Sequence, residues 1–506
     1  MRSDSPNLFC LKKFYRTAIY FFGYTILAYS MLLIATYVML LVFAYRYSTG
    51  YKRWSDDYIR NMVQSAPYVP SISIVAPAYN EKKTIVDNVR SLLNMDYPKF
   101  EVCIVNDGSK DKTLELLINT FELVEVPFDY VQKVHCAPFK RLLRSTNPDY
   151  AKLVVVDKVN GGTKADAVNA GLNVISTPYF INTDVDCILS KDAMYQCIFP
   201  VIMDETIIAV SGTMSMSNGS TLHDGKLVDI RPSSRPVPLF QDLEYKRSFL
   251  VGKMGWSKIN AMNNVSGGYG LFSTEVVINA GGYSSSSFAE DMDMITRMIA
   301  YCCDFNRKYR VVQIPHTCCW TEGPSTLHML YRQRTRWGRG LIQTMWEHRR
   351  LLFNPKYKRL GLITMSYTFL FEFLAPIIEF FGTLMIIFLT FTGGVNWSTF
   401  FVTYFAIYVF SFMLSAFVVF YDYLLGCSYT SVRSYLKLLL AAALEPIVYH
   451  PIIVVCSLVG YFKYITRQKA VWVSMERTGV KHATVPAGGS QPAQQSAPQP
   501  NANQSN

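Results

Sequence analysis

Two aspartates separated by a single residue, Asp184 and Asp186, end the stretch "YFINTDVD" (residues 179–186). Two carboxylates this close repel each other unless a cation lies between them. Mg²⁺ and Mn²⁺ prefer oxygen ligands, and Mg²⁺ is often held by one or two carboxylates together with substrate phosphates. The spacing therefore indicates a metal site that holds a diphosphate. For a single aspartate, capping a helix or closing a turn is the more frequent role.

A lysine that could neutralise a phosphate follows two glycines in "NGGTKAD". Gly161 and Gly162 allow close approach of the backbone, and Lys164 supplies a positive charge. The G-x-x-x-x-G-K spacing of a Walker A loop is missing, so the segment does not predict that type of nucleotide-binding loop.

A second acidic pair, Glu290 and Asp291, follows a Gly/Ser-rich loop and begins a predicted helix in "SFAEDMDMITRM". Acidic residues in this place can simply stabilise the positive end of the helix dipole. A carboxylate here can also act as a general base that takes a proton from an incoming hydroxyl group. The residues alone leave both interpretations open.

Farther along the chain, "QRTRWGRG" combines basic residues with a tryptophan in one short run: Arg334, Arg336, Trp337 and Arg339. Arginine offers positive charge to a leaving diphosphate. Tryptophan offers a flat apolar face of the kind on which sugar rings stack. A basic patch on a membrane surface explains part of the same run.

The elements that must position these residues alternate between apolar runs, polar breaks and helical periodicity. Strands are predicted at "SISIVAPAYNE", "EVCIVNDGS", "LVVVDKVNGG", "YFINTDVD" and "IIAVSGTM", and helices over 82–95 and 164–175. This order is typical of a parallel α/β sheet. Ligands bind such sheets outside the carboxyl ends of the strands, so we expect four carboxylates to share one rim: those of Asp107, Asp157, Asp184 and Asp186.

The composition indicates a membrane protein with a large globular part. Half of the 506 residues are hydrophobic, and the mean hydropathy is +0.15. Residues 17–45 carry no charge, against the roughly 20 apolar residues that cross a bilayer. A secretory signal core is shorter, about 7–15 residues, so we interpret this stretch as a retained anchor. Three more apolar stretches lie near 361–391, 399–426 and 436–462.

Positive charge is concentrated next to these apolar stretches. The formal net charge is +12, and residues 332–359 hold nine Lys/Arg and a single acid, Glu347. The position predicts a cytoplasmic amphipathic belt on anionic lipid. Nucleic-acid binding is the competing interpretation of a basic cluster, and the membrane neighbourhood argues against it.

The membrane topology contains a conflict. One anchor before a cytosolic domain and three crossings after it place both termini outside, yet the basic residues after 462 favour the cytoplasm. Glu372, Pro376 and Glu379 interrupt 361–391, so that segment is the candidate for a re-entrant or interfacial piece. With Glu445, these carboxylates could line a channel for a growing chain, or lie near headgroups or basic partners.

The eleven cysteines are scattered and form no CxxC motif. A disulfide framework is therefore not expected, and the globular part is predicted to face a reducing cytosol. His316 lies beside Cys318 and Cys319, but this spacing matches no usual zinc pattern, and we assign it to packing. Residues from 485 on carry no charge and are predicted to be disordered.

The motifs stand in an order that resembles the membrane-integrated family 2 glycosyltransferases, which include cellulose, hyaluronan, chitin-oligosaccharide and poly-N-acetylglucosamine synthases. The residues that carry the resemblance are "PAYNE" (77–81), "VNDGS" (105–109), "NGGTKADAVNAG" (160–171), "TDVD" (183–186), "SGGYGLF" (266–272), "AED" (289–291) and "QRTRW" (333–337). They cover about 70–340. Val185 stands where the family often has alanine.

The resemblance implies a GT-A fold, an α/β mixed sheet with helices, joined to an all-α transmembrane region. It also implies an inverting transfer from a UDP-sugar to a polysaccharide acceptor, with Mg²⁺ or Mn²⁺ as cofactor. The implied nucleotide-sugar site consists of Pro77, Tyr79, Glu81, Asp107, Lys164 and Asp184. Asp186 would hold the metal together with Asp184.

For the chemistry, the resemblance implies that Asp291 is the general base, with Glu290 beside it in the catalytic pair. The acceptor sugar and the diphosphate would be covered by Gln333, Arg334, Arg336 and Trp337. Six parts are expected: a tail and anchor (1–46), a linker (47–70), the GT-A domain (71–325), basic interface helices (326–360), a transmembrane region (361–465) and a tail (466–506).

Within the family we favour the poly-N-acetylglucosamine and chitin-type branch, by analogy with the "AED" and QRxRW forms and the small membrane region. The expected protein is a synthase of the cell membrane with a cytosolic catalytic domain. Two alternatives remain: a non-processive enzyme that glycosylates a lipid, and an inactive membrane protein that binds polysaccharide. The sequence leaves the donor sugar, the linkage and any accessory subunit open.

Overall fold

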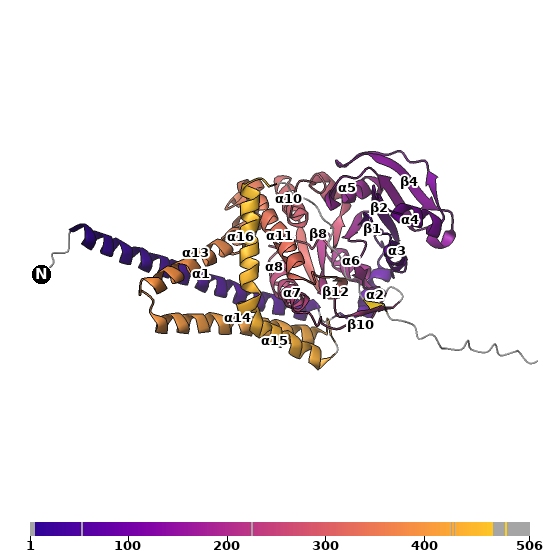
Figure 1. The fold of residues 1–506 in the computed structure, drawn as a ribbon. Coiled ribbons are helices and arrows are strands. Elements are labelled where there is room, and N and C mark those ends of the chain that lie inside the picture. Colours follow the sequence, from indigo (N-terminus) through magenta and orange to yellow (C-terminus); the bar gives the residue numbers. More distant parts are fainter. Residues whose placement is uncertain are drawn as a thin grey trace, which may run out of the picture.

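The computed structural model describes residues 6–51, 54–223, 226–426, 428–429, 431–468 and 481–482. The tail from 485, predicted to be disordered, lies outside the described residues. Figure 1 shows two parts: a sheet domain on the right, and long helices that extend from it to the left.

The predicted α/β sheet is confirmed as a mixed sheet. In the part of the chain that the structure describes, its strand order is β3-β4-β5-β2-β1-β6-β11-β8-β12-β7. The centre is parallel: β1 (Ile72–Ala78) pairs with β2 (Phe100–Asp107) and β6 (Tyr179–Thr183), and β2 pairs with β5 (Leu153–Lys158). The ends of β2, β5 and β6 therefore meet at one edge of the sheet, as expected.

The other half of the sheet mixes the two directions. β11 (Tyr269–Ser273) runs antiparallel to β6 and to β8 (Ile207–Met216), and β12 (Arg310–Thr321) runs parallel to β8. The short strand β7 (Ile188–Leu189) pairs with the end of β12.

Alternating side chains divide the interior into two cores, one on each face of the sheet. Along β1, Ile72, Ile74 and Ala76 belong to one core, and Val75 belongs to the other. Helices α3 (Ile85–Leu93), α4 (Thr113–Phe121) and α6 (Ala193–Met203) contribute to the first core, and α5 (Lys164–Val174) and α10 (Glu290–Asp304) to the second. In Figure 1, α5 lies above β1 and β2, and α3 and α6 lie below these two strands.

The basic segment 119–150, to which the sequence assigns no role, forms the edge of the sheet. β3 (Leu123–Val126) and β4 (Phe139–Ser145) pair antiparallel, and β4 continues onto β5. The Nζ atom of Lys133 donates to the carbonyl oxygens of Leu172 and Ile175 at 3.4 and 2.8 Å. A cation at the end of α5 satisfies carbonyl groups that the helix leaves open.

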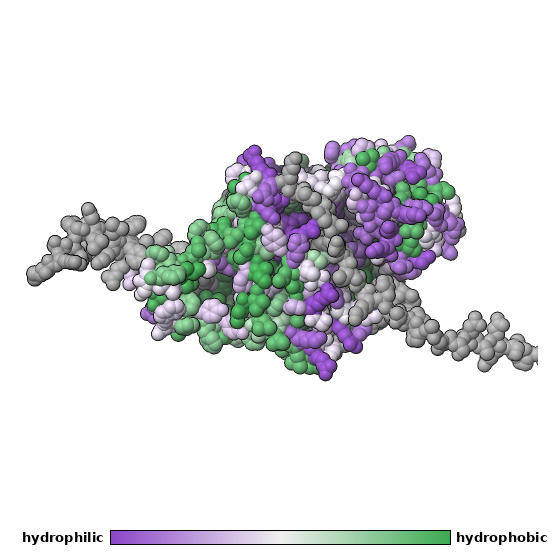
Figure 2. Space-filling model, in the orientation of Figure 1, coloured by the Kyte–Doolittle hydropathy of each residue, from purple (hydrophilic) through white to green (hydrophobic). Residues whose placement is uncertain are grey.

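Among the described residues, three helical segments are long and apolar enough to cross a membrane: Gly23–Tyr51, Leu360–Phe391 and Trp397–Leu425. A fourth candidate is a pair of helices, α15 (Val432–Val448) and α16 (His450–Ile465), bent by 51°. The bend thus falls in the last apolar stretch, whereas the sequence pointed to 361–391. Figure 2 shows hydrophobic residues over these helices and hydrophilic ones over the sheet domain.

A buried and a partly buried ion pair join the membrane helices to α7 and the residue after it. Lys246, the last residue of α7 (Pro236–Lys246), lies 3.1 Å from the Oδ2 atom of Asp422 in α14 (Trp397–Leu425), and both side chains are buried. Arg247 donates to both carboxylate oxygens of Glu445 in α15 at 2.9 Å. These pairs fix α7 and the segment after it against α14 and α15.

Lys246→Met is expected to lower the free energy of unfolding by about 3–5 kcal/mol, because the substitution leaves the carboxylate of Asp422 buried without its counter-charge. The double variant Lys246→Met/Asp422→Leu should recover part of that loss. Thermal unfolding of the full chain in detergent measures both effects. A double variant less stable than the single one would contradict a simple pairwise role.

Candidate active site

The Asp184–Asp186 turn follows the end of β6. Val185 is buried in the core of the sheet domain, while both flanking carboxylates are partly exposed. One carboxylate oxygen of Asp184, one of Asp186 and the Sγ atom of Cys187 lie within 4.8 Å of one another. Since the Cys187 thiol is buried and hard cations prefer oxygen, the two carboxylates fit the Mg²⁺ or Mn²⁺ predicted from the sequence.

Lys164 is the contact that joins this turn to the next loop. Its Nζ atom lies 2.5 Å from the Oδ1 atom of Asp184 and donates to the carbonyl oxygen of Gly267 at 2.5 Å. Burial opposes the charged form, but Asp184 and Glu290 outweigh burial and raise the pKa of Lys164. The ammonium group therefore stays charged, next to the candidate metal ligands.

The "SGG" loop (Ser266–Gly268) lies between the Asp184–Asp186 turn, called the metal turn below, and Asp291, the candidate base. A Cβ atom added at Gly268 would lie 3.7 Å from the Oδ2 atom of Asp184 and 2.6 Å from the Cε atom of Met214. A Cβ atom added at Gly267 would lie 3.8 Å from the Cβ atom of Asp291. Adjacent residues of one loop thus lie close to Asp184 on one side and to Asp291 on the other.

Asp291, at the start of α10, is held by a short chain of hydrogen bonds. Its Oδ1 atom accepts from the backbone N–H of Met292 at 2.9 Å, and its Oδ2 atom accepts from the Nδ2 atom of Asn264 at 3.2 Å. Lys253 donates to the Oδ1 atom of Asn264 at 3.0 Å. Burial lowers the pKa of Lys253 to about 8. The hydrogen bonds from Met292 and Asn264 therefore orient the carboxylate of Asp291 from two sides, as a general base requires.

Glu290 is more deeply buried than its neighbour. Burial raises its pKa, although Lys164 and Arg336 act in the opposite direction. The guanidinium group of Arg336 donates to the carbonyl oxygen of Phe288, just before the acidic pair, at 3.5 Å. The structure thus brings together Lys164, Arg336 and both members of the pair.

Three other site residues predicted on α11 (Leu327–Glu347), namely Gln333, Arg334 and Trp337, contact groups other than the acidic pair. Arg334 is buried and makes a bidentate pair with Glu244, both distances being 2.6 Å, and donates to the Tyr449 hydroxyl. Its guanidinium lies 4.1 Å from the centre of the Trp337 ring. Gln333 accepts from Gln241 at 2.8 Å. Arg334 therefore has a carboxylate partner that the sequence did not predict.

The predicted nucleotide residues lie on β1, β2 and the loops that follow. Tyr79 is exposed, whereas Pro77 and Glu81 are partly exposed. The backbone N–H of Glu81 donates to Thr113 at 2.8 Å, which joins this loop to the start of α4. Asp107 is buried at the end of β2, where its Oδ1 atom accepts from the backbone N–H of Gly161 at 3.0 Å.

Four residues of this region were missed by the sequence interpretation. Lys158 is fully buried and pairs with Asp107 at 2.5 Å and with Asp166 at 2.6 Å. Its signal was a lysine directly after Asp157, at the end of β5. Asn264, just upstream of "SGG", could have been noticed by its place, but Lys253 and Glu244 could not, because only the fold brings them to the site.

Comparison with known proteins gives a consistent result. A family model described as "Glycosyltransferase like family 2" matches residues 70–340. A poly-beta-1,6-N-acetyl-D-glucosamine synthase of Staphylococcus epidermidis is 28% identical over 313 residues, which cover 61% of this chain and 62% of that protein. The Staphylococcus aureus (strain COL) protein of the same name is 30% identical over 270 residues, which cover 53% of this chain and 54% of that protein. The matches thus span less than two thirds of these relatives.

Among solved structures, a mannosyltransferase from Pyrobaculum calidifontis in complex with GDP-Man and Mn²⁺ superposes with a TM-score of 0.48. The two chains are 18% identical, and the superposition covers 87% of this chain and 99% of that one.

Replacement of Asp186 by Asn is expected to weaken the binding of Mn²⁺ in the presence of UDP by at least the ~10–100-fold that loss of an outer-sphere partner costs. The signal of free Mn²⁺ in electron paramagnetic resonance measures this affinity. Asp149→Asn, which changes an exposed aspartate outside the site, is the control. UDP-dependent Mn²⁺ binding of unchanged affinity in Asp186→Asn would remove this residue from the metal site.

Proposed function

Because the chain belongs to the glycosyltransferase-like family 2, we propose that it transfers N-acetylglucosamine from UDP-GlcNAc to the end of a growing β-linked polysaccharide, with inversion at the anomeric carbon. The observation that carries the proposal is the proximity of two different carboxylate sites. The Asp184–Asp186 turn and Asp291 flank the same pair of glycines, so one substrate can meet a metal-held diphosphate and a general base at once.

Each charged group then has one role in the reaction. Asp291 takes the proton from the acceptor hydroxyl, whose oxygen forms a bond to the anomeric carbon while the bond from that carbon to the diphosphate breaks. Asp184 and Asp186 would hold Mg²⁺ or Mn²⁺, which supplies positive charge for the departing UDP. Lys164 and Arg336 add fixed positive charge on the same side. Asn264 and Lys253 hold the base in place.

Nucleotide binding is proposed for the loops at the ends of β1 and β2. Tyr79 offers an exposed ring, and Glu81 and Asp107 offer carboxylates, to the uridine. The carboxylate of Asp107 pairs with Lys158, and this ion pair balances its negative charge inside the protein. Trp337, next to Arg334 on α11, is proposed to stack on the acceptor sugar.

The setting proposed for the reaction is the cytosolic face of the cell membrane. The basic run 332–359 next to the first of the later apolar helices supports this side, because cytoplasmic segments carry an excess of Lys and Arg. Arg247, paired with Glu445 and donating to Ser415, places polar groups among the helices. Charged groups at membrane depth face a bundle interior or a wet cavity, which supports export of the polymer through these helices.

Membranes that contain the chain should release UDP from UDP-GlcNAc in the presence of Mg²⁺ or Mn²⁺ and produce a long polymer. The assay follows UDP and product size together, with the Asp186→Asn variant as the inactive control. A single sugar on a lipid would instead establish the non-processive alternative. UDP release from UDP-glucose alone would contradict the proposed donor, and none from any UDP-sugar would contradict the proposed activity.

Asp291→Asn is expected to lower the turnover number by about 10²–10⁴-fold, the usual contribution of a general base. Asn264→Ala, which removes only the orienting hydrogen bond, should lower turnover less. UDP affinity should stay unchanged in both. The matched control is Glu275→Gln, at an exposed glutamate that pairs with Arg307. Full turnover in Asp291→Asn would remove this residue as the base.

A further inference from the structure

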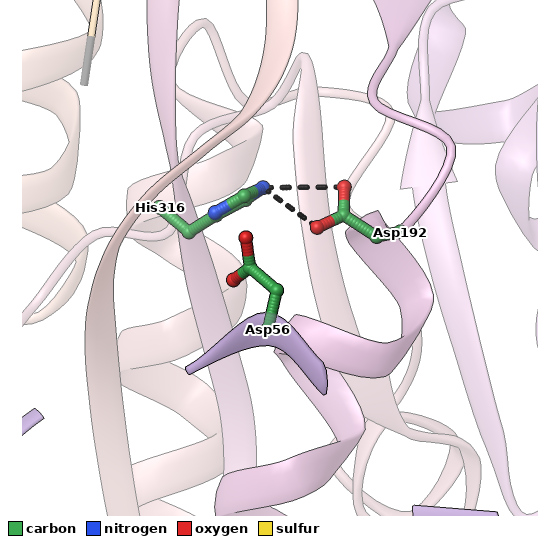
Figure 3. Close-up of side chains that lie close together, drawn as sticks. All are labelled: Asp56, Asp192 and His316. Atoms are coloured by element: carbon green, nitrogen blue, oxygen red, sulfur yellow. Dashed lines mark hydrogen bonds and ion pairs between the residues drawn. The ribbon is translucent and has the colours of Figure 1, made fainter. Parts of the chain in front are cut away.

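A second group of metal-ligating side chains lies outside the proposed active site. It consists of Asp56 at the start of α2 (Asp56–Ser65), Asp192 just before α6, and His316 in β12. One carboxylate oxygen of each aspartate and one imidazole nitrogen lie within 4.8 Å of one another. Figure 3 shows the three side chains converging from three different elements, with the Nε2 atom of His316 turned toward Asp192.

The backbone of β12 departs from regular pairing where His316 stands. The register between β12 and β8 shifts between Gln313 and Thr317. Such an irregularity re-aims a side chain that a regular strand would direct elsewhere. The imidazole consequently reaches Asp192, from which its Nε2 atom lies 3.2 Å. The sequence assigned His316 to packing with its neighbouring cysteines, but only Cys318 and Cys319 are buried in the core.

A buried glutamine, Gln196, donates hydrogen bonds to the carboxylates of both Asp56 and Asp192. Gln196 is 1% exposed. Its Nε2 atom donates to the Oδ1 atom of Asp56 at 2.7 Å and to the Oδ2 atom of Asp192 at 3.3 Å, and its Oε1 atom accepts from the Tyr51 hydroxyl at 3.2 Å. Ser190 also donates to Asp192. Metal-binding carboxylates characteristically have such outer partners, which orient them and are needed for affinity.

The charge of the group is not balanced within it. Two carboxylates and one imidazole carry a net negative charge whether or not the histidine is protonated. Two cations line the adjoining cavity: Lys191 is exposed, and Arg60 pairs with Asp96 at 2.5 Å and lies over the ring of Tyr195. A cavity of about 300 Å³ adjoins the group, and Asp56, Asp192 and Gln196 are among its lining residues. There is room for water at the remaining coordination positions of an ion.

We propose that Asp56, Asp192 and His316 form a second divalent-cation site, of the borderline class that accepts one imidazole and two carboxylates, with Zn²⁺ as its probe. One nitrogen and two oxygen ligands leave at least one position of a tetrahedral ion for water. The bound ion would join α2, which follows the membrane helix α1 (Pro6–Tyr51), to α6 and β12 of the sheet domain. The site shares no residue with the proposed catalytic site and does not depend on the proposed function.

The test uses the full chain in detergent with Asp184→Asn/Asp186→Asn, so that the catalytic metal ligands do not contribute. After equilibrium dialysis against Zn²⁺, mass spectrometry should find about one Zn²⁺ per chain, and Co²⁺ in its place should give the visible absorption of a bound ion. Adding His316→Ala or Asp56→Asn should abolish both. The matched controls Asp57→Asn, next to Asp56, and His328→Ala, an exposed histidine of α11, should retain the ion.

Thermal unfolding supplies a second measurement, because a ligand that binds only the folded chain raises the unfolding temperature. Zn²⁺ should raise it in the background chain and in both controls, but not in His316→Ala or Asp56→Asn. Zn²⁺ binding of equal stoichiometry in His316→Ala and Asp56→Asn would overturn the proposal. Absence of bound Zn²⁺ in the background chain would overturn it as well.

Discussion

The ion pair and hydrogen bond of Lys164 are the contacts on which the candidate active site depends. One ammonium group binds a carboxylate that follows β6 and a carbonyl oxygen that precedes β11. These strands are neighbours in the sheet, so the lysine joins the turn after β6 to the loop before β11. Without this lysine, its contact between the Asp184–Asp186 turn and the "SGG" loop (Ser266–Gly268) would be lost. The same charge would meet a diphosphate placed between them, which links the stability of the site to its proposed chemistry.

A second constraint is the attachment of the catalytic domain to the membrane helices. Arg334 joins α11 to Glu244 of α7 and to Tyr449 at the junction of the bent helices α15 and α16. Arg247 and Lys246 extend the same set of contacts to α15 and α14. Buried arginines and lysines of this kind are stable only when paired. Helix α11, which carries the residues proposed to bind the acceptor sugar, is therefore attached to the helices proposed to export the product.

Much of this architecture follows from local sequence signals. Alternating apolar runs predicted the strands, and helical spacing predicted α3 and α5 to within a few residues, because both patterns report burial directly. The D-x-D spacing and Lys164 could be singled out because their chemistry is visible in residue type and neighbourhood, whereas the role of Asp291 as a base came from the resemblance to the family. These roles stay predictions. The antiparallel strand β11 was not predicted, since the residues from Tyr269 to Phe272 were interpreted as part of a motif.

The residues that the sequence did not reveal depend on contacts between distant segments. Lys158 looks like an ordinary polar end of a strand until Asp107 and Asp166 are placed around it. Arg334 pairs with Glu244, about ninety residues earlier in the chain. Asp56, Asp192 and His316 are similarly far apart in sequence, and an irregular strand brings the histidine to them.

The central claim is that Asp184 and Asp186 hold a divalent cation against the diphosphate of a uridine nucleotide. Electron–nuclear double resonance on Mn²⁺ bound to the full chain with UDP tests it most directly, because it detects coupling between the metal and phosphorus nuclei. The account predicts a phosphorus-31 coupling that disappears in Asp184→Asn/Asp186→Asn. Bound Mn²⁺ without that coupling, or a coupling that persists in the double variant, would contradict it.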